Sequence, residues 1–106
     1  MTRKELMGIL KKTGYPIRYN SFKTPPSTPY LIYLATDTDN TFADNKVYEK
    51  NTNYQVELYT DKKDFDVQEN IENLFDEYEI PWESSEAYIK EEKLYQVIYF
   101  MMVEGG

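Results

Sequence analysis

The chain has 106 residues and a formal net charge of -7, and it contains neither cysteine nor histidine. Without these two residue types it can form no disulfide, thiolate zinc site, cysteine nucleophile or Ser-His-Asp triad. The length predicts one domain, residues 1–106. Apolar residues make up 41% of the chain and charged residues 29%, which is typical of a domain with its own hydrophobic core.

A helix is predicted over residues 3–13. Thr2 and Glu5 fit a capping box, in which each side chain satisfies a free backbone N–H of the first turn. Gly14 can adopt the left-handed conformation that ends a helix, and Pro16 prevents its continuation. The charged and polar residues of this helix predict no signal peptide. No apolar run in the sequence approaches the roughly 20 residues of a membrane span. The apolar face of the helix carries Leu6, Ile9, Leu10 and Thr13.

Two strands separated by a proline-rich linker follow this helix. The first is predicted over 17–22, and the second, apolar on both faces, over 30–36. Three prolines between Pro25 and Pro29 favour an extended, exposed connection, because proline cannot donate to a sheet ladder. A proline-rich ligand motif is the functional alternative.

A long hairpin connects the strand at 30–36 to a strand predicted over 47–60. Alternation of Tyr54, Val56 and Leu58 with polar residues indicates one buried face in its second half. The tip, residues 36–46, is acidic and polar, and we expect it to project into solvent as a loop. It resembles the start of a calcium loop, but Phe42 stands where that loop needs glycine, and Tyr48 where it needs glutamate.

The C-terminal half predicts a helix over 66–78 and strands over 82–89 and 94–103. Asp66 and Glu69 fit a second capping box. The strand at 94–103 is the most apolar segment, which favours a position inside the sheet. Helical spacing assigns an apolar stripe to Val67, Ile71, Leu74, Phe75 and Tyr78, and an outward face to Glu69, Glu72, Asp76 and Glu77.

The predicted element order is therefore αβββαββ. Hairpin-connected strands and two helices indicate an α+β fold, with a mostly antiparallel sheet of about five strands and both helices packed on one face.

Charge is distributed unevenly along the chain. The first 24 residues carry six basic side chains and one acidic one, whereas the remainder carries six basic and eighteen acidic ones. A basic surface of one copy can therefore meet an acidic surface of another, although two separately solvated faces give the same pattern. An acidic chain is a poor binder of nucleic acid, so no sequence-specific nucleic-acid partner is expected. Candidate contact residues are Arg3, Lys4, Lys11, Lys12, Asp37, Asp39, Phe42 and Asp44.

No motif for catalysis or cofactor binding is present in the sequence. The paired carboxylates, such as Asp37 with Asp39, fall in predicted turns, where water keeps a carboxyl group near its ordinary behaviour. None of the four glycines forms a phosphate-binding loop. We therefore expect no enzyme, no cofactor and no metal site. Phe42 is the one aromatic residue of the tip, and it either contacts a partner or folds back onto its own hairpin.

Several phrases of the sequence resemble the small tail-completion, tail-terminator-like proteins of long-tailed phages and prophages of Gram-positive bacteria. The resemblance covers nearly the whole chain. The phrases that carry it are KKTGYPIRYNSF, PYLIYL, ADNKVYEKNTNYQVELYTDKKD and YQVIYF.

The resemblance implies an α+β structural subunit that forms a ring of six copies at the head-proximal end of the tail. Its implied partners are further copies of itself, the tail tube protein and a neck connector protein, with no membrane. The implied location is the virion, with the bacterial cytoplasm before assembly. Two alternatives remain: a head-side neck connector, and an acidic phage-encoded inhibitor of a host protein.

Overall fold

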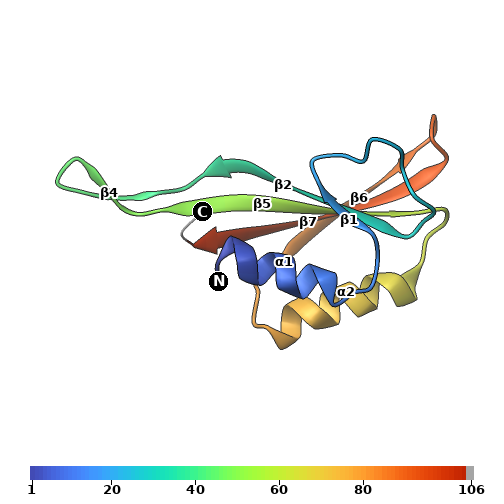
Figure 1. Cartoon of the computed structure of the whole chain (residues 1–106), viewed down its shortest axis with the longest axis horizontal. Coiled ribbons are helices and arrows are strands. Elements are labelled where there is room, and N and C mark those ends of the chain that lie inside the picture. The colour runs from blue at the N-terminus through green and yellow to red at the C-terminus, as the bar shows by residue number, and fades with distance from the viewer. Residues whose placement is uncertain (105–106) are drawn as a thin grey trace.

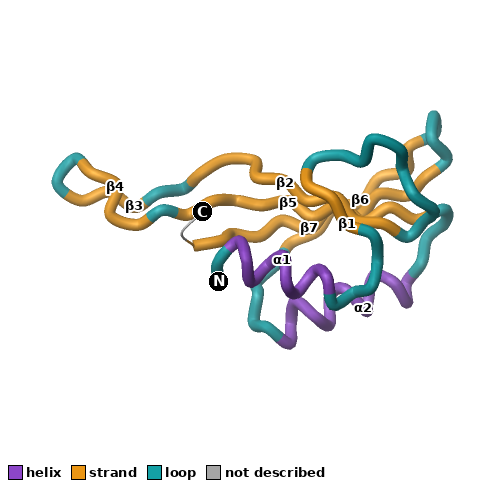
Figure 2. The backbone as a smooth tube through the Cα atoms, in the orientation of Figure 1, coloured by secondary structure: helices purple, strands orange, loops and turns teal. Residues whose placement is uncertain are grey.

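The computed structural model describes residues 1–104 and shows an α+β fold in which two helices cover one face of a five-stranded sheet (Figures 1 and 2). The helices are α1 (Arg3–Lys11) and α2 (Phe65–Glu77). The sheet strands are β1 (Ile17–Tyr19), β2 (Tyr30–Thr38), β5 (Asn51–Thr60), β6 (Glu83–Ile89) and β7 (Leu94–Glu104). A separate two-stranded sheet is formed by β3 (Thr41–Ala43) and β4 (Lys46–Glu49).

The strand order in the main sheet is β1-β2-β5-β7-β6. Strand β1 is parallel to β2, and every other neighbouring pair is antiparallel. The apolar β7 has a neighbour on each side, which confirms that it is not an edge strand. The strand predicted over 47–60 is divided into β4 and β5, and the strand predicted over 17–22 has only three residues.

Both helices begin with a side-chain cap. The Thr2 hydroxyl accepts a hydrogen bond from the Glu5 backbone N–H at 3.2 Å, which confirms the predicted start of the first helix. The helix ends at Lys11, two residues before the predicted end, and Gly14 has the expected positive φ, 79. The predicted Asp66 cap of α2 is wrong. Asp64 is the cap, because its backbone is extended and its carboxylate accepts from the Val67 N–H at 3.2 Å.

The core lies between the helices and the inner face of the sheet. Alternate residues of β5 and β7 point into it, and Tyr54, Val56 and Leu58 are buried as the alternation predicts. In the stripe of α2 only Ile71 and Phe75 are buried, whereas Tyr78 is 39% exposed. The α1 residues Leu6, Ile9 and Leu10 are buried as well.

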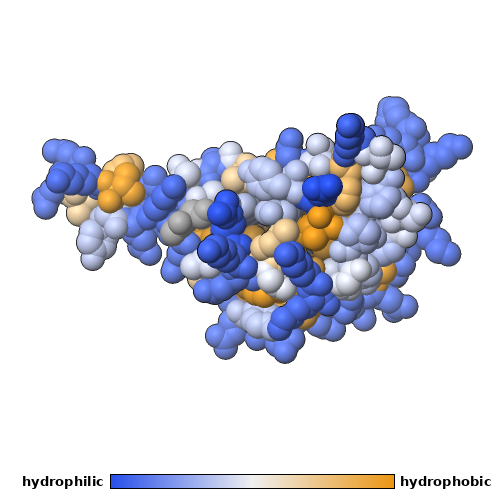
Figure 3. Space-filling view, in the orientation of Figure 1, coloured by the Kyte–Doolittle hydropathy of each residue, from blue (hydrophilic) through white to orange (hydrophobic). Residues whose placement is uncertain are grey.

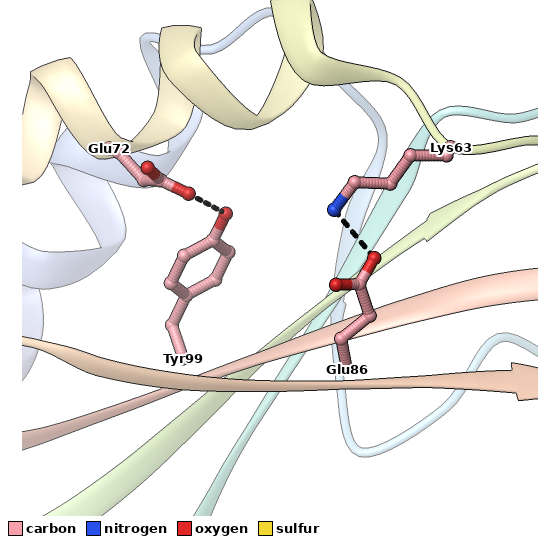
Figure 4. Close-up of polar contacts among 4 residues, drawn as sticks. All are labelled: Lys63, Glu72, Glu86 and Tyr99. Atoms are coloured by element: carbon pink, nitrogen blue, oxygen red, sulfur yellow. Dashed lines mark hydrogen bonds and ion pairs between the residues drawn. The ribbon is translucent and has the colours of Figure 1, made fainter.

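The prediction that Glu72 lies on the outward face of α2 is wrong. Its carboxylate accepts a hydrogen bond of 2.8 Å from the hydroxyl of Tyr99 on β7 (Figure 4). Tyr99 is fully buried and packs edge-on against Phe75 and Trp82, with 5.5 Å between ring centroids in each pair. Burial, and after it the bond to Glu72, raises the pKa of the Tyr99 hydroxyl.

A second polar contact connects the loop before α2 with the edge of the sheet. Lys63 and Glu86 form an ion pair of 2.5 Å (Figure 4). Both side chains are partly exposed, so this pair contributes little to stability.

The molecule is elongated because the hairpin of β3 and β4 projects beyond the end of the main sheet, where β2 ends and β5 begins. Its principal extents are 50 × 29 × 22 Å, and its radius of gyration is 14.8 Å. A compact chain of this length would have a radius of gyration of about 13 Å. This hairpin points away from the helices (Figure 1). We call residues 36–51 the arm.

Candidate contact surface on the arm

The arm is a twisted hairpin closed by a two-residue turn. Asp44 and Asn45 connect β3 to β4, and both have positive φ, 52 and 63. Two such residues give the turn whose twist matches that of paired strands, and Asp and Asn tolerate this conformation best after glycine. The expectation of a loop over 36–46 is therefore wrong, since β3 and β4 are paired strands.

Polar contacts fix the joint between the arm and the main sheet. The buried Asn51 donates from its side-chain amide to the Asp39 carbonyl at 3.1 Å. Its backbone N–H donates to the Asn40 side chain at 3.0 Å, and its carbonyl accepts from the Asp39 N–H at 2.9 Å. These contacts join the two chain segments where the arm leaves the sheet, so they restrict the orientation of the arm relative to the main sheet.

The acidic candidates of the arm differ in their surroundings. The Asp37 carboxylate accepts from the Asn53 amide at 2.9 Å and from the Thr36 hydroxyl at 3.1 Å, so it has a structural role at the base. Asp39 contributes its backbone to the joint. Asp44 lies in the end turn, where its carboxylate is exposed and available to a partner.

An exposed apolar group lies near the end of the arm. Phe42 is 69% exposed and stands opposite Val47, which is 52% exposed, so its ring is not folded back into the hairpin. Tyr48, at the irregularity between the two strands, is 77% exposed. We call Phe42, Val47 and Tyr48 the arm patch. Figure 3 shows apolar surface on the arm between hydrophilic residues.

Sequence reasoning identified Phe42 but missed Val47 and Tyr48. The available signal was the apolar character of these two residues in the segment KVYE. Both were included in the strand predicted over 47–60, whose apolar residues were expected to face the core.

The basic candidates lie on α1 and at its C-cap, and the N-terminal end of α1 is beside the end of the sheet from which the arm projects (Figure 1). Arg3, Lys4 and Lys11 are exposed on the helix, and Lys12 is its C-cap residue. The Lys12 ammonium donates to the Tyr78 hydroxyl and lies 4.8 Å from the centre of that ring. This hydrogen bond raises the pKa of Lys12. The structure thus brings the basic residues together on one helix and the acidic ones together on the arm.

Comparison with known proteins adds no relative. Neither a scan against protein-family models nor a search of curated proteins finds a match. Within residues 1–104, no group of three or more acidic side chains could hold a metal ion, and no helix is long and apolar enough to cross a membrane.

Proposed function

We propose that the protein is a structural subunit that assembles with further copies of itself through the arm. The observation that carries this proposal is the arm patch, an exposed apolar group on a hairpin with a fixed direction. Covering such a patch with a partner removes apolar surface from water, which lowers the free energy of the assembly. Aromatic residues are the side chains most often found as anchors of interfaces.

The assembly that we propose is the one implied by the sequence resemblance. The subunits form a ring of six at the head-proximal end of a phage or prophage tail and join the tail to the head. Further partners are the tail tube protein and a neck connector protein. The protein would be located in the virion, after it has accumulated in the bacterial cytoplasm before assembly. The role is structural, without catalysis, and the elongated shape and the arm support it.

The test of self-assembly is a Phe42→Ala variant with Phe65→Ala as the matched control. Phe65 lies at the start of α2 and is 67% exposed, close to the 69% of Phe42. Both variants should melt close to the parent, because little ring area is buried in either. Sedimentation velocity should show oligomers for the parent and for Phe65→Ala, and their loss for Phe42→Ala.

An unchanged oligomer in Phe42→Ala would contradict the role of the arm patch. A chain that stays monomeric but binds one host protein would instead favour an inhibitor. The tail assignment has its own test, electron microscopy of particles that lack this protein. Filled heads without tails, or tails of uncontrolled length, are expected.

A further inference from the structure

A hollow on the outer surface of α1 is left unfilled by residues 1–104. It measures about 270 Å³ and lies where α1 meets the C-terminal end of α2. Its walls are Glu5, Gly8, Ile9, Lys12 and Tyr78. The glycine forms the part of the wall that belongs to the middle of α1.

Gly8 has no structural reason within the described chain to be glycine. It lies inside α1, where glycine is among the least favourable residues. A Cβ built at this position would meet nothing within 4 Å, so alanine would fit without a clash. Glycine there keeps the hollow open and lets another group approach the helix backbone closely.

The surroundings of Gly8 are basic. The surface neighbours of a helical residue are the residues three and four positions before and after it. For Gly8 these are Lys4, Glu5, Lys11 and Lys12. Three ammonium groups and one carboxylate therefore neighbour Gly8 on the helix surface. Of these, Lys12 and Glu5 line the hollow itself, and Lys4 and Lys11 lie beside it on α1. This rim favours an acidic partner.

The arm has the complementary properties. Residues 36–51 include the four acidic residues Asp37, Asp39, Asp44 and Glu49 and the two basic residues Lys46 and Lys50. The arm patch lies among them. The arm points beyond the end of the sheet and away from the helices (Figure 1), so it reaches a hollow of this kind only on another copy.

Charge also distinguishes this hollow from the two larger ones. The hollow of about 540 Å³ beside Met1 and Pro81 is lined by three glutamates, Glu5, Glu79 and Glu104. The hollow of about 430 Å³ on the outer face of the sheet contains Glu92 and no basic residue. Both would repel an acidic arm.

We infer that the hollow around Gly8 is the docking site for the arm of a second copy, with Phe42 against the glycine. This inference rests on the proposed self-assembly and identifies its receiving surface. The contact joins two different surfaces, so the copy that donates its arm keeps its hollow free, and the copy that receives the arm keeps its own arm free, for further copies. Repetition of such a contact closes a ring when the rotation between copies allows it.

The test fills the hollow with Gly8→Leu, and Asn73→Leu on the exposed surface of α2 is the control. Sedimentation equilibrium of the full chain should show self-association that is weaker by about tenfold or more for Gly8→Leu, a change of about 1.4 kcal/mol or more. Asn73→Leu should match the parent. Gly8→Ala should raise the melting temperature while it weakens association, an opposition that a folding defect cannot produce.

A charge exchange tests the rim. Lys11→Glu with Lys12→Glu should weaken association, more strongly at low salt. Adding Asp44→Lys and Glu49→Lys to the same chain should restore it, since each copy then has an acidic rim and a basic arm.

Normal association of Gly8→Leu, or no restoration by the charge exchange, would overturn the docking site. If Phe42→Ala still dissociates the oligomer in that case, the arm remains a contact and only its receiving surface is wrong. A parent chain that stays monomeric at every concentration would contradict both proposals.

Discussion

The hydrogen bond between Tyr99 and Glu72 should be one of the strongest polar contributions to stability. Tyr99→Phe removes the donor, keeps the ring between Phe75 and Trp82, and leaves a half-buried carboxylate without its partner. Hydrogen bonds to charged groups contribute about 1.5–3 kcal/mol. Because Glu72 retains some solvent contact, we expect a loss near the lower end of that range. An outward-facing Glu72, as the sequence predicts, would make Glu72→Ala cost less than about 0.5 kcal/mol, and the bond to Tyr99 makes us expect a larger loss.

Urea denaturation of a double-mutant cycle measures this bond. Tyr99→Phe and Glu72→Ala should each lower the free energy of unfolding, and the double variant should lose less than the sum. Glu69→Ala, exposed on the same helix, should change it by less than about 0.5 kcal/mol. Strictly additive losses, or a neutral Glu72→Ala, would refute the reasoning.

Three further predictions concern the stability of the fold. Phe75→Ala should cost about 3–5 kcal/mol, because the ring is 1% exposed, whereas the half-buried Leu74→Ala should cost less, and equal denaturation midpoints would contradict this. Asp64→Ala should cost about 1 kcal/mol through loss of the α2 cap, measurable as a lower thermal midpoint. Burial raises the pKa of Tyr59 and Tyr99 above the ordinary 10.0, so an unfolded chain releases these protons first as the pH rises. The contribution of these two protonated hydroxyls to the free energy of unfolding is complete below about pH 10, and above it should fall by up to about 1.4 kcal/mol per pH unit for each group. In alkaline denaturation, Tyr99→Phe should therefore lose stability less steeply with pH than the parent.

Local signals predicted the first helix well. Thr2 and Gly14 act on the backbone within a few residues, and the buried face at Leu6 and Ile9 follows from helical spacing. These effects need no knowledge of distant chain segments, which is why sequence alone identifies them.

Tertiary contacts explain what the sequence missed. Glu72 looked solvent-facing because its partner Tyr99 lies on a strand 27 residues away. The arm strands β3 and β4 are exposed along their whole length, so no alternation of buried and exposed residues marks them. The turn at Asp44 and Asn45 was a usable signal, since both residue types adopt positive φ with little strain.

The position of Trp82 determines what fluorescence can report about this protein. It is the chain's one tryptophan, and its indole N–H donates to the Asp76 carboxylate at 2.9 Å where α2 meets the sheet. Intrinsic tryptophan emission therefore reports the opening of the core. A two-stranded extension such as the arm can open locally at far lower free energy than the core. Emission will therefore remain native while the arm frays, and amide hydrogen exchange at β3 and β4 is the measurement that detects the arm's own disorder.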